Sequence, residues 1–172
     1  MMAQTFKRPP SGLDRTQFVA LYGRVYEHSP WIAEAAWAMG LKPQHDTVEG
    51  LHEALAAIVN AASHERQLAL LNAHPDLAGR LAVRGELTTE STSEQASAGL
   101  DKCSPEEFRR FTELNDAYRR KFPFPFIMAV KGKSRAEILD AFERRIHHDE
   151  DVEFQAALSE VNKIALLRLR EL

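Results

Sequence analysis

The sequence predicts an all-α fold: a single-domain bundle of about eight helices, with a loop-rich middle segment and one short extended segment. Three observations lead to this prediction. Apolar residues recur at spacings of three and four through most of the chain, as they do in amphipathic helices. Ser, Thr or Asp residues precede several of these runs and can cap helices. Pro and Gly residues, which interrupt helices, separate the runs.

Two helices are expected near the start of the chain. Asp14 can cap the first, and Pro30 ends that region. The second helix covers 31–39, and Gly40 provides its C-terminal stop. The apolar face of the first helix consists of Phe18, Leu21, Tyr22 and Val25.

The third and fourth helices are expected between Thr47 and His74. The third starts at about Thr47, and Ser63 can cap the fourth. Pro75 disfavours helical backbone at the residue before it, so the fourth helix should end at His74. The aligned apolar residues of the third helix are Val48, Leu51, Leu55, Ile58 and Val59.

Residues 75–103 form the loop-rich segment, because they are rich in Gly, Ser and Thr. Short helices are expected within it at 76–83 and 91–98. Two capping boxes follow, Ser104–Glu107 and Ser134–Glu137. Each box indicates the start of a longer helix.

The segment Phe122–Phe126 cannot form a regular helix, because prolines occupy two alternate positions. The apolar run that continues it comprises Phe126, Ile127, Met128, Ala129 and Val130. This run has no obvious partner strand, so its backbone N–H and C=O groups need other partners. A bound heterocycle with amide-like edges could supply some of them. The alternative is an extended core segment whose groups are satisfied by water and helix termini.

The composition limits the class of protein. The chain has 172 residues, of which 44% are hydrophobic and 27% charged, as in ordinary globular domains. A net charge of −3 gives no electrostatic case for binding nucleic acid or an anionic membrane. No run approaches the roughly 20 apolar residues of a membrane span. The single cysteine, Cys103, excludes an intramolecular disulfide and a thiolate zinc cluster.

The start of the chain is polar and lacks the apolar core of a signal peptide. We therefore expect residues 1–12 to form a flexible lead-in and residues 13–172 to form the helical domain. A soluble cytoplasmic protein is the default expectation.

His74 is the first candidate for chemistry, because histidine moves protons well near neutral pH. Pro75 would fix the backbone and aim the imidazole across a pocket. The structural alternative is a histidine at a helix C-terminus, where the helix dipole favours it. Asp76 is most simply the N-cap of the next short helix.

Ser91, Glu94 and Gln95 form a polar cluster about twenty residues after His74. Ser91 and Glu94 have the spacing of a capping box, which is a sufficient structural explanation. A helix N-terminus also suits anionic ligands, because its backbone N–H groups are free. A capped helix whose first turn faces a substrate satisfies both interpretations.

The last helix is expected from about Asp151 to the C-terminus, and Arg168 continues its apolar stripe. Burial of an unpaired guanidinium costs several kcal/mol. Arg168 therefore either extends to solvent at the helix end, forms a structural ion pair, or meets an anionic ligand such as a carboxylate.

His147 and His148 precede three acidic residues and superficially suggest a metal site. Adjacent helical residues point in different directions, however, so the spacing is poor for chelation. A solvated polar junction between helices is the simpler interpretation.

Three ordered motifs resemble the 2-oxo-4-hydroxy-4-carboxy-5-ureidoimidazoline (OHCU) decarboxylases of purine catabolism. They are His74–Gly79, Ser91-x-x-Glu94-Gln95-x-x-Ala98-Gly99-Leu100 and Phe124–Ile127. The last helix, including 161–169, is similar as well. The resemblance spans about 13–172, and three motifs with fitting spacers are more specific than any one of them.

The resemblance implies an all-helical fold, a homodimer and no cofactor. It implies removal of the C4 carboxylate of OHCU to give (S)-allantoin, the last step from urate to allantoin. By this analogy His74 is the main acid–base catalyst and Glu94 its partner. Substrate-binding residues by the same analogy are Pro75, Ser91, Gln95, the backbone of Phe126–Val130, and Arg168. No metal is implied.

One departure from the family pattern stands at Lys131, where relatives often carry an arginine. An ammonium is a point charge, whereas a guanidinium binds in a bidentate way. Any side-chain contact of residue 131 with substrate is therefore in question, while backbone contacts upstream are not. Two other functions stay open: a non-catalytic helical interaction module, and a metal-dependent hydrolase using His147 and His148.

Overall fold

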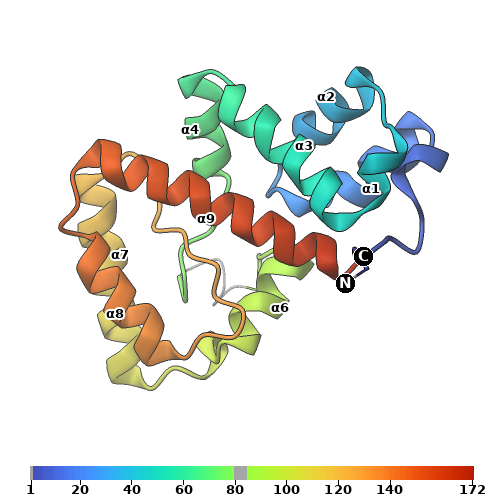
Figure 1. The fold of residues 1–172 in the computed structure, drawn as a ribbon. Helices are drawn as coiled ribbons and strands as arrows, with labels where there is room; N and C mark the ends of the chain where they lie inside the picture. The colour runs from blue at the N-terminus through green and yellow to red at the C-terminus, as the bar shows by residue number, and fades with distance from the viewer. Residues whose placement is uncertain (1, 80–84) are drawn as a thin grey trace. The chain divides into compact units, whose positions relative to one another are not determined.

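The computed structural model describes residues 2–79 and 85–172 and is all-α in these ranges (Figure 1). The chain divides into two compact units, Met1–Ala73 with Val161–Leu172, and His74–Glu160. We refer to them as unit 1 and unit 2. The described residues contain no β-sheet, and one isolated bridge joins Thr5 to Thr47. The prediction of an all-α protein is therefore confirmed.

Unit 1 contains four complete helices; two of them start at the predicted caps Asp14 and Ser63, and Thr47, the predicted start of a third, also acts as a cap. They are α1 (Arg15–Tyr22), α2 (Trp31–Met39), α3 (Val48–Ala61) and α4 (His64–Asn72). The side chains of Asp14, Thr47 and Ser63 accept hydrogen bonds from the first turns of α1, α3 and α4. Gly40 follows α2 with a φ of 90°, a conformation that favours glycine. Short 3₁₀ turns cover Pro10–Gly12, Gly23–Val25 and Pro43–Asp46.

The segment before residue 13, expected to be a flexible lead-in, makes specific contacts within unit 1. The Phe6 side chain is buried and its ring meets Tyr22 edge to face. The Gln4 side-chain amide donates to the Arg170 carbonyl at 2.8 Å. These contacts place the described part of the lead-in against the helices of its own unit.

Unit 2 contains α6 (Thr89–Ser97), α7 (Pro105–Lys121), α8 (Arg135–Arg145) and the first part of α9 (Glu150–Arg170), whose remainder belongs to unit 1. A 3₁₀ turn covers Leu100–Lys102. The predicted capping boxes open α7 and α8. These two helices lie side by side (Figure 1).

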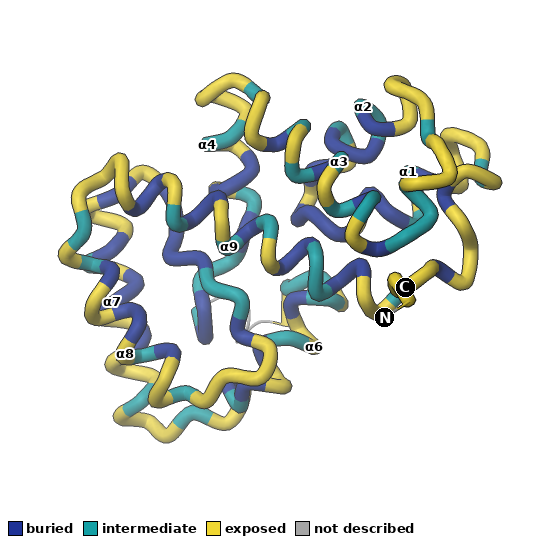
Figure 2. Tube along the Cα trace, viewed as in Figure 1, coloured by how far each residue is buried: buried dark blue, intermediate teal, exposed yellow. Residues whose placement is uncertain are grey.

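The core of unit 2 is aromatic. Tyr118 on α7 contacts four phenylalanine rings at centroid distances of 4.5 to 6.1 Å. Figure 2 shows the resulting pattern on α7, where buried and exposed faces alternate along the helix. The four rings belong to Phe122, Phe124, Phe126 and Phe142. Burial of such large rings is a main source of stability in a small core.

Two expectations about the middle segment change. Of the helix expected over 76–83, residues 76–79 are not helical and include a turn at Leu77 and Ala78, whereas residues 80–83 fall outside the described residues. The expected cap at Ser91 is wrong, because the Thr88 side chain accepts from the Ser91 N–H and α6 starts earlier. Ser91 is instead buried within the helix.

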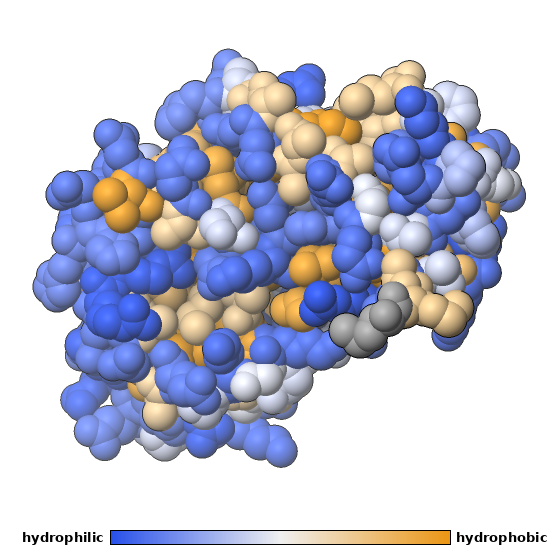
Figure 3. Space-filling model, viewed as in Figure 1, coloured by the Kyte–Doolittle hydropathy of each residue, from blue (hydrophilic) through white to orange (hydrophobic). Residues whose placement is uncertain are grey.

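The surface seen in Figure 3 is mostly hydrophilic, and its hydrophobic residues form small separate areas. Over the described ranges, no helix combines the length and apolar character needed to cross a membrane.

Replacing Ser104 by alanine is expected to lower the free energy of unfolding by about 1 kcal/mol, because it removes one half of the capping box of α7. Urea denaturation measures this change. The matched control is Ser159→Ala at an exposed position inside α9, where a better helix former should leave stability equal or slightly higher. Equal effects of the two substitutions would contradict the capping role.

Candidate active site

His74 lies just beyond the end of α4, where the expected helix stop is confirmed. Its side chain is 6% exposed, so the imidazole is shielded from bulk water. Pro75 then directs the chain into the turn at 76–79. A buried imidazole beside this turn is a candidate for proton transfer near neutral pH.

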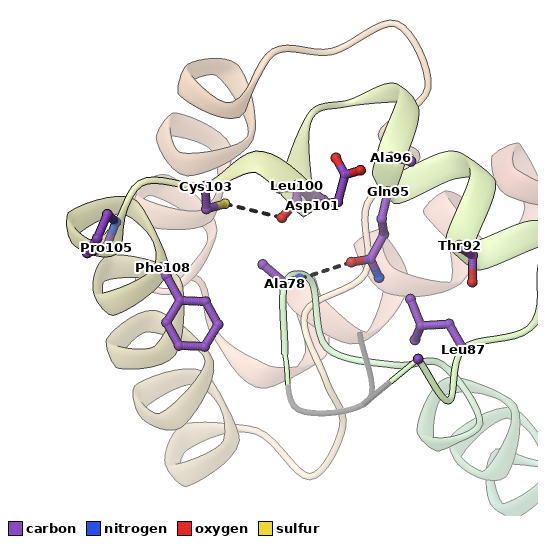
Figure 4. Close-up of a pocket in the computed structure, with 11 residues that line it drawn as sticks. Ala78, Leu87, Thr92, Gln95, Ala96, Leu100, Asp101, Cys103, Pro105 and Phe108 are labelled. Atoms are coloured by element: carbon purple, nitrogen blue, oxygen red, sulfur yellow. Dashed lines mark hydrogen bonds between the residues drawn. The ribbon is translucent and has the colours of Figure 1, made fainter. Parts of the chain in front are cut away.

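Two amide side chains hold this turn. The Gln95 Oε1 accepts from the Ala78 N–H at 3.0 Å (Figure 4). Its Nε2 donates to the Asp76 carbonyl at 3.4 Å. The Asn115 amide donates to the Leu77 carbonyl at 2.9 Å. Three consecutive residues after Pro75 are thus fixed by side chains from α6 and α7.

The local backbone explains why the turn needs these bonds. Ala78 has a φ of 51°, which is unfavourable for a residue with a Cβ atom. Such strain persists only where surrounding contacts impose it, and it is concentrated at functional sites. Asp76 forms an ion pair with Arg119 of α7 at 3.2 Å, which ties the turn to that helix as well.

The polar cluster on α6 is split between two environments. Ser91 and Gln95 are one helical turn apart and both are buried, at 6% and 5% exposure. Glu94 is intermediate in exposure. The buried face of α6 therefore carries the Ser91 hydroxyl and the Gln95 amide. Gln95 connects this face to the turn at residues 76–79.

The segment Phe122–Val130 is extended, as the prolines predicted. One of its backbone carbonyls accepts a hydrogen bond from an arginine side chain. The Arg145 guanidinium donates to the Ile127 carbonyl at 2.7 Å, and the Val130 carbonyl accepts from the Lys133 N–H at 2.9 Å. Between these anchors, the backbone groups of Met128 and Ala129 make no hydrogen bond to the described part of the chain. Unpaired backbone groups at half-exposed positions are available to a ligand.

Helix α7 brings the turn and the extended segment together. Asn115 and Tyr118 lie three residues apart on its buried face. Asn115 holds Leu77, and the Tyr118 ring contacts the Phe126 ring at a centroid distance of 5.6 Å. The turn after Pro75 and the Phe126 ring therefore both contact the buried face of α7.

Arg168 belongs to unit 1, where it forms a buried ion pair. Its Nη2 lies 3.0 Å from Glu27 Oε1, and both side chains are almost fully buried. Its Nη1 donates to the Arg24 carbonyl at 3.5 Å. The interpretation that Arg168 extends to solvent is wrong, and the interpretation of an ion pair is confirmed.

The two histidines expected at a solvated junction between helices differ in their exposure to solvent. His147 is exposed, whereas Nδ1 of His148 lies 3.0 Å from Oε2 of the fully buried Glu153. Within the described ranges, no group of three or more His, Cys, Asp or Glu side chains is arranged to hold a metal ion. The metal-dependent hydrolase therefore gains no support from these residues.

A cavity of about 550 Å³ adjoins the turn in unit 2. Of the candidate site residues, only Gln95 lines it, together with Ala78 of the turn. Burial raises the pKa of the Cys103 thiol in this cavity, and the thiol donates to the Leu100 carbonyl at 3.4 Å. A protonated, hydrogen-bonded thiol is a poor nucleophile. The other lining residues are Gly85, Leu87, Thr92, Ala96, Asp101, Pro105 and Phe108.

Sequence reasoning missed Asn115, Arg145 and Glu153. Arg145 had a usable signal, because it continues the apolar stripe of α8 as Arg168 does in the last helix. Glu153 is 0% exposed, yet it stands in an acidic run that is typical of a solvated helix start.

Comparison with known proteins identifies the family of this chain. A family model for OHCU decarboxylase matches residues 11–170. The chain is 50% identical over 159 residues to the OHCU decarboxylase of Halalkalicoccus jeotgali, covering 92% of this chain and 86% of that protein. It is 47% identical over 159 residues to the OHCU decarboxylase of Haloferax volcanii, covering 92% of this chain and 90% of that protein.

A solved structure is also similar. The crystal structure of (S)-allantoin synthase matches with a TM-score of 0.72 and 32% sequence identity, covering 93% of this chain and 51% of that chain. The fold, the site and the relatives together define the class of this protein, an all-α carboxy-lyase. The chain belongs to the OHCU decarboxylase family.

Proposed function

We propose that this protein decarboxylates OHCU to (S)-allantoin, the last step of urate conversion to allantoin, at the unit 2 site around His74. The observation that carries the proposal is that one unit contains both the buried His74, followed by a turn that Gln95 holds, and a segment whose Met128 and Ala129 backbone groups are unpaired within the described chain. A ureidoimidazoline presents amide-like N–H and C=O edges that such backbone groups can bind.

The substrate can accept its own electrons. Breaking the bond between C4 and the carboxylate releases CO₂ and leaves an electron pair at C4. This pair moves toward C5, and the π electrons of the C5=N bond move to nitrogen, which takes up a proton, so that a neutral enol-like species forms. A proton is then added at C5, and the C4 hydroxyl loses its proton to become the carbonyl of allantoin. Neither pyridoxal phosphate nor thiamine is required for this sequence.

His74 is the residue proposed to manage these protons. Delivering the proton to one face of C5 sets the hand of the product, so the imidazole needs a fixed direction. Glu94 is proposed as its partner, either orienting His74 or acting electrostatically on the substrate carboxylate. Glu94 is intermediate in exposure and lies on α6, one residue before Gln95.

The remaining candidates are proposed to hold the ring and its substituents. Pro75 and the backbone of Phe126–Val130 would contact the ureidoimidazoline, and Ser91 would supply a hydroxyl. Gln95 already uses one lone pair and one N–H for the turn, and an amide retains one of each for substrate. Arg168 would bind the substrate carboxylate or a nearby polar group. It would have to do so while it is ion-paired with Glu27.

Replacing Gln95 by methionine is expected to reduce kcat/KM by at least about tenfold, because both hydrogen bonds to the strained turn disappear. Steady-state kinetics on freshly generated OHCU measures this change. Ser93→Ala, on the same helix at an exposed position, is the matched control and should retain full activity. Wild-type kinetics in the folded Gln95→Met variant would contradict the role of the clamp.

We further infer a homodimer that acts in the cytoplasm, with residues 13–172 as the functional domain. The family resemblance supports the dimer, and the absence of a membrane-crossing helix from the described residues is compatible with the location. Light scattering of the purified protein tests the oligomeric state, and a monomeric mass at assay concentration would contradict it.

The reaction is tested by following CO₂ release and product identity. Urate, uricase and hydroxyisourate hydrolase generate OHCU in place, and the protein is then added. Faster CO₂ release matched mole for mole by allantoin is the expected result. Faster CO₂ release without allantoin would assign a different decarboxylation, and an unchanged rate would contradict the proposal.

A further inference from the structure

Unit 2 contains a buried charged network that the proposed reaction does not use directly. Glu153 on α9 is 0% exposed and accepts a hydrogen bond from the Tyr118 hydroxyl at 2.7 Å. Its Oε1 also accepts from the Arg145 Nε at 2.8 Å, and its Oε2 lies near His148. Burial and the bond to Glu153 raise the pKa of Tyr118, so its hydroxyl stays a donor. Glu153 is therefore paired with the Arg145 guanidinium inside the core.

Arg145 connects this network to the extended segment. Its Nη1 donates to the Ile127 carbonyl at 2.7 Å, and its guanidinium carbon lies 4.4 Å from the centre of the Phe126 ring. The Phe126 ring also stacks on the Phe142 ring, with a centroid distance of 3.9 Å and an interplanar angle of 9°. Arg145 thus holds two consecutive residues of the segment, one through its backbone and one through its ring.

Stability alone is a weak reason for such a network. A buried ion pair often contributes no more than well-packed apolar residues of the same volume, because both charges lose their hydration. What apolar residues cannot supply is a directed donor to a backbone carbonyl. The directed bond here falls on Ile127, immediately before Met128 and Ala129, whose backbone groups have no partner in the described chain.

We propose that Arg145 is a positioning residue of the decarboxylation site: by fixing the Ile127 carbonyl, it sets the direction in which the Met128 and Ala129 backbone groups face the substrate. Glu153 keeps the Arg145 guanidinium in place, since it binds the side of the guanidinium that Ile127 does not use. This inference rests on the proposed function, because it assigns a role within that site.

The test replaces the network by apolar residues of similar size in one variant, Arg145→Met with Glu153→Leu and Tyr118→Phe. No member of this trio then remains buried and unpaired, and His148 keeps access to solvent with its side chain 40% exposed. The control is Tyr118→Phe alone, which disturbs the same carboxylate but leaves the bond from Arg145 to Ile127 intact. The far-ultraviolet circular dichroism spectrum and urea denaturation confirm folding of both.

In the triple variant we expect a KM about tenfold higher and a kcat that changes much less. A tenfold change is the usual effect of losing one well-made hydrogen-bonding arrangement. The control should keep the wild-type KM, whereas a merely structural network would leave KM unchanged in both folded variants. An unchanged KM in the folded triple variant, or an equal rise in the control, overturns the positioning role.

A second substitution covers the case in which the triple variant does not fold. Arg145→Lys keeps the charge next to Glu153, but a compact ammonium does not span Glu153 and the Ile127 carbonyl as the planar guanidinium does. KM should again rise, and a wild-type KM in this folded variant overturns the inference. Wild-type protein without turnover in the same assay would instead overturn the proposed function, and this positioning role with it.

Discussion

Replacing His74 by alanine is expected to slow (S)-allantoin formation by about 10²–10⁴-fold, the usual contribution of a positioned acid–base group. The imidazole is the buried titratable group that stands directly before the restrained turn, and water cannot deliver a proton to one face of C5 with the same selectivity. Coupled assays that follow optical activity measure both the rate and the hand of the product.

The matched control for this substitution is His147→Ala. His147 is an exposed histidine of the same unit, so its loss should leave turnover at the wild-type level. The same control bears on the metal-dependent alternative, which requires His147. Full activity in a folded His74→Ala variant would remove the acid–base assignment, and loss of activity in His147→Ala would revive the alternative.

Replacing Arg168 by alanine is expected to lower the free energy of unfolding by about 3–5 kcal/mol, because Glu27 is left as a buried charge without its main partner. His28, 3.7 Å from the other Glu27 oxygen, is exposed and can compensate only part of this loss. Urea denaturation of the purified variant measures the change. A loss below about 1 kcal/mol, the range of exposed ion pairs, would contradict the buried pair.

A second variant separates stability from substrate binding. The double substitution Arg168→Met with Glu27→Leu removes both charges and should regain most of the lost stability. If Arg168 also meets the substrate, KM should remain high in this stable protein. A wild-type KM there would show that the ion pair is the whole role of Arg168.

Helix starts were predictable because their signals are local. Asp14, Ser63 and Ser104 each cap a helix through a backbone group three residues away, so the sequence around them contains the whole interaction. The start of α6 was mispredicted because two hydroxyl residues compete for one cap. Thr88 takes the cap, and the buried position of Ser91 depends on packing that no local pattern reveals.

The candidate site was predictable in its motifs and much less in its supports. His74 and Gln95 were selected from residue type and order, and the structure joins their segments through the turn. Asn115 reaches Leu77 across 38 positions and Arg168 reaches Glu27 across 141 positions. Such pairings depend on the three-dimensional path of the chain. A single sequence can therefore show that a charged residue lies in an apolar stripe, but it does not show which residue pairs with it.

The measurement that tests the central claim most directly is the circular dichroism of an OHCU-generating mixture with and without this protein. Spontaneous decay of OHCU does not select one hand, whereas proton delivery from a fixed His74 does. We predict a dichroic signal of (S)-allantoin that grows faster with more protein and is lost in His74→Ala. A trace identical to that of the protein-free mixture would contradict the account.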